Sequence, residues 1–316
     1  MQTAGQQRGF TLVEMLVSIV IGLILVAAGG KLYVDSKYNN GIQAEIKTMQ
    51  QNGRFVLDLL SSDIRRAGYH GGNINRGSIA GTGIQTDNGT CPSTGAQWGA
   101  MIDRSIYGLD DDNDSYACIP DTDYLRGDIL SVRYAEGEPV TTTPSGDELF
   151  MRSSLTQGAV FQGKNELHPD NAITASYVTV RKLVSNAYYI GPSAVVSCAD
   201  GSSPPALYRK ALGSTGAPVT QELVSGVENL QIMYEVDVNG DGSLYRVLDA
   251  DQMSTTDWQS ISRIHLWLLV RQTCTYGDYT DPNSSYPMGS QTYAYPSTDR
   301  NLRRILFARA INVRNH

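Results

Sequence analysis

The sequence predicts an α+β fold in which one long N-terminal α-helix packs on an antiparallel β-sheet head with large loop insertions. Three observations support this. An almost uncharged apolar segment covers residues 10–30, and apolar residues continue at three- and four-residue steps to residue 67. From about residue 73, short β-rich segments alternate with turn residues. A chain of 316 residues is also long enough to bury a substantial core.

The composition argues against nucleic-acid binding and against catalysis. The net charge is −7 and no block of Lys and Arg is present, so no specific nucleic-acid partner is predicted. The sequence has no Walker loop, nucleophile elbow or convincing dinucleotide fingerprint. We therefore expect that the protein is not an enzyme. The histidines are scattered and lack metal-ligand spacing: His70, His168, His265 and His316.

The segment 10–30 is long enough to cross a membrane. At about 1.5 Å per residue, roughly 21 helical residues reach about 31 Å, which spans the bilayer core. Arg8 precedes the segment and no acidic residue does, so the short N-terminal end is expected on the cytoplasmic side and the remainder outside. A cleaved signal peptide that ends at the small residues of 26–30 is the alternative interpretation.

Glu14 is the one charged residue of this segment. A carboxylate near the centre of a membrane span costs about 2.5–3.5 kcal/mol, and less near its end, so it usually has a partner or a function. In one interpretation Glu14 lies at the headgroup level and has no particular role. In the other it is functional.

The helical pattern continues over residues 31–68. Gly68 ends it, because glycine readily adopts the backbone conformation that stops a helix. The stripe that we expect to face the head consists of Ile42, Ile46, Met49, Val56, Leu60, Ile64 and Ala67.

Residues 69–316 are predicted to form one β-rich head domain, since no repeat or disordered linker divides them. The predicted strands are 128–134, 176–180, 229–236, 261–270 and 303–313, and the predicted loops lie near 77–98, 141–148, 200–205 and 275–297.

The four cysteines follow the apolar segment, and none belongs to a C-x-x-C pair. This pattern favours disulfides in an oxidising compartment such as a bacterial periplasm. Three connectivities are open. Pairs close in sequence form the shorter loops, which favours Cys91 with Cys118 and Cys198 with Cys274.

The stretch DVNGDG begins like a calcium loop. Asp237, Asn239 and Asp241 place oxygen atoms at alternate positions, and the Ser243 carbonyl is the next expected ligand. The acidic residue that usually closes such a loop is replaced by Leu248, so Asp249 or Asp251 would have to complete the shell. A metal-free hairpin turn is the alternative.

A second acidic cluster lies in LDDDNDS, residues 109–115. Asp110, Asp112 and Asp114 occupy alternate positions, but the loop lacks the glycine of a calcium motif. A solvated acidic loop is the favoured interpretation.

The N-terminal run Gly9-Phe10-Thr11-Leu12-Val13-Glu14 resembles the processing signal of type IV prepilins and pseudopilins. The resemblance implies that residues 1–9 are a leader, that a prepilin peptidase cuts between Gly9 and Phe10, and that the Phe10 amine is methylated. This amine would carry a positive charge. Glu14 of a neighbouring subunit can neutralise that charge in the apolar interior of a filament.

Three further stretches resemble PilW-type minor pilins: residues 53–72, residues 227–251 with the following 261–272, and residues 303–315. Such chains often have a cysteine where this one has Gly72. The resemblance implies a type IV pilin fold and a minor pilin that primes pilus assembly and sits at the tip. By the same resemblance, such pilus systems serve twitching motility, adhesion and DNA uptake.

The implied partners are other minor pilins, the major pilin, the prepilin peptidase, the inner-membrane assembly platform and a large tip adhesin. The implied location is the bacterial inner membrane before assembly, with the head in the periplasm, and then the pilus. The alternatives are a J-type minor pseudopilin of type II secretion and a membrane-anchored adhesin or ligand-binding ectodomain.

Overall fold

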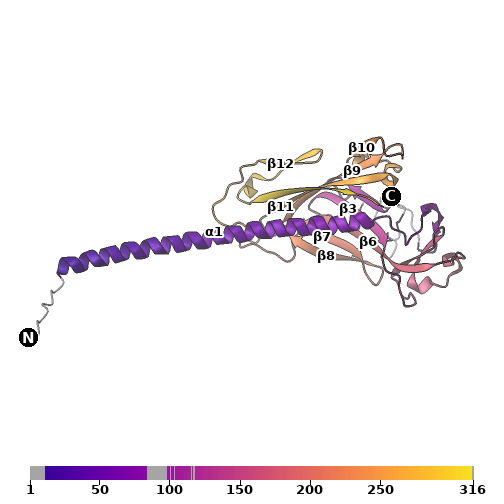
Figure 1. Ribbon diagram of the computed structural model, residues 1–316, viewed down its shortest axis with the longest axis horizontal. Helices are drawn as coiled ribbons and strands as arrows, with labels where there is room; N and C mark the ends of the chain where they lie inside the picture. The colour runs from indigo at the N-terminus through magenta and orange to yellow at the C-terminus, as the bar shows by residue number, and fades with distance from the viewer. Residues whose placement is uncertain are drawn as a thin grey trace, which may run out of the picture. The chain divides into compact units, whose positions relative to one another are not determined.

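The computed structural model describes residues 11–83, 98–99, 101–102, 104–114, 116 and 118–314. The backbone forms two compact units, Met1–Thr48 and Met49–His316. One continuous helix, α1 (Leu12–Arg66), belongs to both (Figure 1). The long N-terminal helix predicted from the apolar pattern is therefore confirmed. Packing places its last turns in the same compact unit as the strands.

Gly68 ends α1 as predicted. Its φ of 74° lies in the left-handed region, which residues with a side chain rarely adopt. The Gly68 amide donates a hydrogen bond to the Arg133 carbonyl at 3.0 Å, so the helix end is fixed to a strand of the head.

The first sheet of the head has eight strands in the order β1-β5-β4-β6-β3-β2, with β7 paired to β6 and β8 to β7. All pairs are antiparallel except β1 with β5. The strands are β1 (Ile79–Ala80), β2 (Ile106–Leu109), β3 (Arg126–Ala135), β4 (Leu149–Ser153), β5 (Gly158–Gln162), β6 (Thr179–Pro192), β7 (Pro205–Leu212) and β8 (Pro218–Ser225).

The second sheet has four antiparallel strands in the order β10-β9-β11-β14, and β12 and β13 form a separate hairpin. These strands are β9 (Val227–Asp237), β10 (Tyr245–Leu248), β11 (Ile261–Arg271), β12 (Ser285–Met288), β13 (Gln291–Ala294) and β14 (Arg304–Asn312). Short 3₁₀ helices lie in the connections: η1 (Arg76–Ser78), η3 (Gly163–Asn165), η4 (Pro169–Asn171), η5 (Ala250–Gln252), η6 (Asp257–Gln259) and η7 (Ser297–Asp299).

Four of the five predicted strands are confirmed, since they coincide with β3, β9, β11 and β14. The fifth, 176–180, overlaps only the start of the much longer β6. The loop predicted over 275–297 is wrong in part because β12 and β13 lie within it. Their buried side chains pack on Leu269 in a small separate core. Strands of four residues are too short to give a clear periodic signal.

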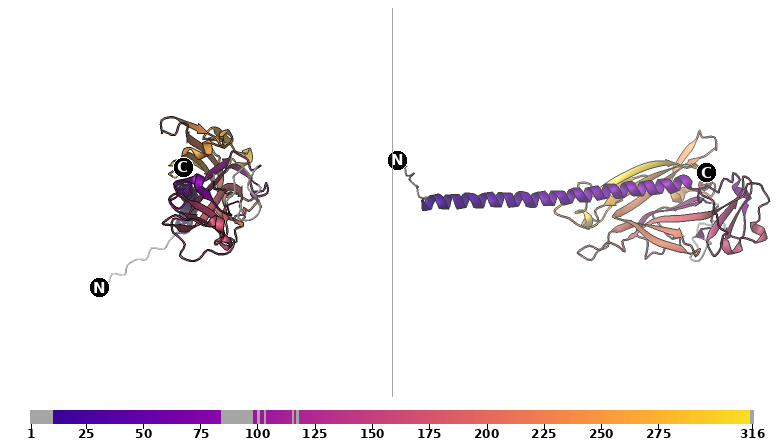
Figure 2. Two further views of the ribbon diagram at one scale, coloured as in Figure 1. Left: turned by 90° about the vertical axis from the view of Figure 1, so that its right-hand side faces the viewer. Right: turned by 60° about the horizontal axis from the view of Figure 1, so that its bottom comes forward.

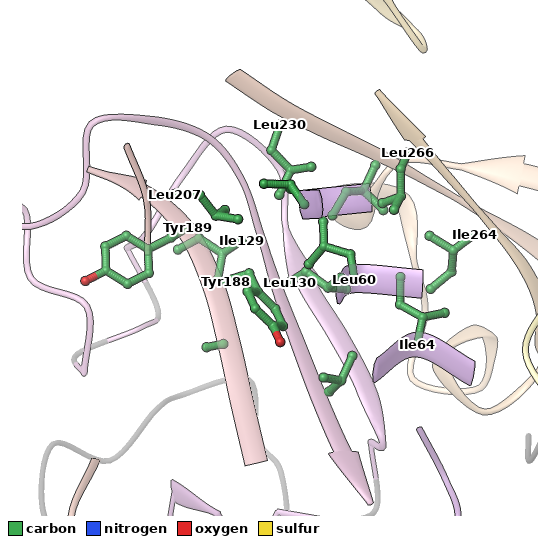
Figure 3. Close-up of a cluster of buried hydrophobic side chains, with 14 of the residues drawn as sticks. Leu60, Ile64, Ile129, Leu130, Tyr188, Tyr189, Leu207, Leu230, Ile264 and Leu266 are labelled. Atoms are coloured by element: carbon green, nitrogen blue, oxygen red, sulfur yellow. The ribbon is translucent and has the colours of Figure 1, made fainter. Parts of the chain in front are cut away.

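The C-terminal half of α1 lies between the two sheets (Figures 1 and 2). Leu60 and Ile64 are fully buried, with Leu130 and Tyr188 of the first sheet and Leu230 and Leu266 of the second in the same core (Figure 3). Phe307 of β14 lies so close to Gly53 that a side chain there would collide with its ring. Every predicted stripe residue from Met49 onward is buried.

A disulfide between Cys198 and Cys274 fastens the two sheets to each other, which confirms that predicted pair. Cys198 follows β6 of the first sheet, Cys274 follows β11 of the second, and their Cα atoms are 5.5 Å apart. Cys91 lies outside the described residues, so its pairing with Cys118 stays a prediction.

A buried charge network anchors the segment between β11 and β14. The Arg304 guanidinium donates to the Glu228 carboxylate at 2.6 and 3.1 Å and to Asp281 at 3.4 Å, and both carboxylates are almost fully buried. The Tyr286 hydroxyl of β12 donates to the same Asp281 carboxylate at 2.8 Å. The network therefore connects this insertion to the start of β9.

Asp63 is a buried carboxylate on α1 that faces the first sheet. Its oxygens accept hydrogen bonds from the Tyr134 hydroxyl at 2.9 Å, the Asn186 amide at 2.7 Å and the Tyr188 hydroxyl at 2.5 Å. These donors come from β3 and β6, so one side chain fixes the helix to two neighbouring strands. Burial, and next the Asp63 charge, raises the pKa of both tyrosines, which keeps them protonated as donors.

Replacement of this carboxylate should destabilise the head strongly. Asp63→Ala leaves three buried donors without their acceptor and should lower the free energy of unfolding by about 3 kcal/mol or more. Asp58→Ala is the matched control on the same helix, because its carboxylate is exposed and its pair with Arg309 is worth at most about 1 kcal/mol. Denaturation of the full-length chain in detergent measures both, and equal losses would contradict this role of Asp63.

Candidate functional site

The N-terminal half of α1 presents an apolar surface that nothing within its own compact unit covers. Residues 11–40 are all solvent-exposed, and Leu12 and Val26 expose 77% and 73% of their surface. By length and composition this helix can cross a membrane. Apolar surface of this extent is unfavourable in water, so lipid or other helices must cover it.

Glu14 lies in the first turn of α1 and forms a capping box with Thr11. The Thr11 amide and hydroxyl donate to Glu14 Oε2 at 3.2 and 3.1 Å, and the Glu14 amide donates to the Thr11 hydroxyl at 3.3 Å. These bonds satisfy amide groups that the helix itself cannot pair. The sequence interpretation missed this role, although the spacing T-x-x-E is its recognised signal.

The capping box gives Glu14 a purpose in the isolated chain, which the sequence interpretation did not consider. Both side-chain bonds end on the same carboxylate oxygen, Oε2. Glu14 is exposed, so a cation from another chain can approach it. Gly9 and Phe10 lie outside the described residues, and cleavage, methylation and the charge pair with Phe10 stay predictions.

The predicted calcium loop forms the exposed turn between β9 and β10. The Asp237 carboxylate accepts from the Gly240 and Gly242 amides, both at 2.9 Å. Asp241 accepts from the Ser243 amide at 2.9 Å, and its hydrogen bond with the Ser243 hydroxyl lowers the pKa of Asp241. The Asn239 amide donates to the Ser243 hydroxyl at 2.8 Å. These bonds close a hairpin turn, and calcium binding there stays a prediction.

Asp249 and Asp251 do not complete this loop, so that part of the prediction is wrong. In the hairpin, Tyr245 pairs with Asp237 and Leu248 with Tyr234, which places Asp249 beyond the opposite end of β10. At about 3.4 Å per residue the four-residue strand separates the loop from Asp249. The Asp249 carboxylate instead accepts from the Ser290 hydroxyl at 2.8 Å.

The second acidic stretch divides instead of forming one cluster of Asp110, Asp112 and Asp114. Asp112 turns back on its own loop and accepts from the Asn113 and Asp114 amides at 2.6 and 2.9 Å. Asp110 instead groups with Asp111 and with Asp128 of β3. Partial burial, and next the charges of Asp249 and Asp251, raises the pKa of Asp110 to about 6.

The described histidines lie in separate surroundings. His70 is buried beside the Ser105 hydroxyl at 3.4 Å. His168 accepts a hydrogen bond from the Asp170 amide at 3.3 Å, and His265 contacts the Glu235 carboxylate at 2.9 Å. His316 lies outside the described residues.

Two family models match the chain. Residues 5–30 match the prokaryotic N-terminal methylation motif, and residues 187–315 match Type IV Pilus-assembly protein W. The two matches support a PilW-type type IV pilin. The second begins within β6, earlier than the stretch recognised from residue 227, and includes the whole second sheet. No curated protein and no solved structure matches the chain.

As a type IV pilus minor pilin, the protein is a structural component that is anchored in a membrane by α1 and associates with a pilus. Its family places it in contact with other pilins, a prepilin peptidase and the assembly machinery.

Processing of the pilin should occur between Gly9 and Phe10. Mass spectrometry of the purified chain should find an N-terminal Phe10 with one added methyl group, and Gly9→Val should leave the leader attached. Gly5→Val is the matched control because it changes a leader glycine away from the cut. An intact Met1 in the wild type, or equal processing of both variants, would contradict the prediction.

Proposed function

We propose that this pilin co-assembles with other minor pilins in the bacterial inner membrane, primes type IV pilus assembly and remains at the pilus tip. Before assembly, the N-terminus is cytoplasmic and the head is periplasmic. In the pilus, the protein serves twitching motility, adhesion and DNA uptake. Its partners are the other minor pilins, the major pilin, the inner-membrane platform and a large tip adhesin.

The observation that carries the proposal is the exposed apolar half of α1 with one carboxylate in its first turn. A helix that only anchored the head would need the apolar surface but no charge. In a bundle of such helices, the Glu14 carboxylate lies at the level where a neighbour's N-terminal amine enters. The two opposite charges attract strongly in a medium of low dielectric constant, whereas either charge alone is costly there.

The J-type pseudopilin of a type II secretion system is the alternative, because it would share the signal and the helix. The match of residues 187–315 to a pilus-assembly family favours the pilus. A membrane-anchored adhesin is the second alternative, and it predicts that Glu14 serves only the capping box.

Two substitutions separate the charge of Glu14 from its capping role. Glu14→Gln keeps a side-chain acceptor for the Thr11 amide but removes the charge, so it should abolish incorporation into pili almost as completely as Glu14→Ala. Thr11→Val removes the hydroxyl and keeps the charge, so it should assemble nearly normally. Immunoblots of sheared pili measure incorporation.

The membrane fraction of the same cells is the control, because all three variants should be present there at wild-type levels. Normal assembly of Glu14→Gln together with failure of Thr11→Val would show that capping, and not charge, is required.

The proposed tip position predicts a single label at one pilus end. An epitope tag can be inserted at the exposed residues 141–143, in the loop that connects β3 to β4. Immunogold microscopy should then find the tag at one end of each labelled pilus. Deletion of the chain should reduce the number of pili much more than their length, because priming limits initiation. Gold label along the pilus shaft would contradict the tip position. If the deletion strain has normal pili but no longer secretes proteins, the protein is instead the pseudopilin.

A further inference from the structure

Three carboxylates meet where β2, β3 and β9 come together. Asp110 and Asp111 directly follow β2, and the pairing of Leu109 with Ile129 places Asp128 of β3 opposite Asp110. One oxygen from each carboxylate lies within 4.8 Å of those from the other two. Asp128 is only 1% exposed, so the group extends into the interior of the head.

Asp110 and Asp128 share a hydrogen bond between their carboxyl groups, and the other hydrogen bonds to this triad come from neutral groups. The Asp128 oxygens accept from the Asp111 amide at 3.1 Å and the Ile232 amide at 2.6 Å. The Gln231 amide donates to Asp111 at 2.8 Å, and the Gln291 amide donates to Asp110 at 3.3 Å. Among the described residues, no Lys or Arg forms an ion pair with any of the three.

The surroundings add further negative charge. Asp249 and Asp251 lie close enough to Asp110 to add to the negative charge around it. Like charges this close repel each other, so the arrangement is unfavourable unless protons or a cation neutralise it. A carboxylate as deeply buried as that of Asp128 needs several hydrogen bonds, a proton or a cation to offset the loss of water.

An independent observation at the same place is the Tyr234 hydroxyl. Tyr234 is fully buried, and within the described part of the chain its hydroxyl has no hydrogen-bond partner. It occupies the space that a side chain at Gly108 would need. Gly108 lies two residues before Asp110, and among the charged groups that act on the Tyr234 hydroxyl Asp128 has the largest effect, so the hydroxyl lies near the triad. Buried hydroxyl groups are ordinarily hydrogen-bonded, and a bound water or ion can be the partner.

Two cavities give access to the triad. One of about 310 Å³ is lined by Gly108, Asp110 and Asp251, and another of about 330 Å³ is lined by Asp111, Gln231 and Gln291. Water can therefore reach both sides of the carboxylates and complete the coordination of a bound ion.

We propose that Asp110, Asp111 and Asp128 bind one calcium ion at the junction of β2, β3 and β9. Carboxylate oxygens are the ligands that hard divalent cations prefer, and calcium accepts irregular sets of six to eight oxygens that include water. Magnesium requires a more regular octahedral shell, which a turn of consecutive aspartates supplies less well. A water bound to the ion supplies the missing partner of Tyr234.

The ion would stabilise the junction between the two sheets. Asp128 already contacts the Ile232 amide of the second sheet, and Gln291 of the β12–β13 hairpin contacts Asp110, so relief of the repulsion between the three carboxylates would remove a cost of holding these parts together. This inference does not depend on the place of the pilin in a filament, because its effect is on the stability of the head.

The test uses the full-length chain in detergent micelles, stripped with EDTA and then melted with and without calcium chloride. A ligand that binds only the folded state raises the melting temperature, by about 5 °C at roughly a hundredfold excess over Kd. Isothermal titration should give one site per chain, with magnesium binding at least about tenfold more weakly.

Two matched double variants locate the site. The double variant Asp110→Asn/Asp111→Asn should abolish the calcium-dependent shift in melting temperature. The double variant Asp237→Asn/Asp241→Asn, in the β9–β10 turn, should retain this shift. Both pairs remove two charges and conserve side-chain size. If the first pair fails to fold, Asp110→Asn alone should weaken calcium binding at least about tenfold, because it removes one of three charged ligands.

The proposal is overturned by any of three results. The first is no shift in wild type at millimolar calcium. The second is an undiminished shift in the Asp110 and Asp111 variants. The third is loss of the shift in the Asp237 and Asp241 variant, which would place the ion in the hairpin turn.

Discussion

The attachment of α1 to the first sheet depends on one buried carboxylate. Apolar packing of Leu60 and Ile64 between the sheets supplies buried area but no directional bond, which leaves the helix some freedom to shift. Asp63 removes that freedom, since three donors from β3 and β6 converge on its two oxygens. The register of the helix on the head is thereby fixed, and the Gly68 bond to Arg133 fixes where it ends.

The two halves of α1 consequently serve different partners. From Met49 to Ile64 the apolar face is buried against the head, whereas residues 11–40 remain exposed and must be covered by lipid or by other subunits. Glu14 lies in the exposed N-terminal half of α1, and two roles are compatible there. In the single chain it caps the helix with Thr11, and in the proposed filament its charge would pair with a neighbouring amine. A carboxylate retained for capping alone would not need to be charged.

The sequence predicted the local motifs of the functional site well. The processing signal and the apolar segment are each encoded by adjacent residues, and the match of residues 5–30 to the methylation motif supports both. The acidic triad could not be found in this way. Asp128 is 17 residues from Asp111, and only the pairing of β2 with β3 brings them together. The same reason explains the error over Asp249, whose distance from the loop depends on the register of β10.

The sequence by itself determined the α+β class, the extent of α1 and four of the long strands, because each has a periodic apolar pattern that local reasoning detects. It also favoured the Cys198–Cys274 bond, which the structure contains. Tertiary structure alone decided the pairing of eight strands in one sheet, the position of the short strands β12 and β13, and the convergence on Asp63. These features depend on contacts between residues far apart in the chain, whose free energy appears only once the whole core has formed.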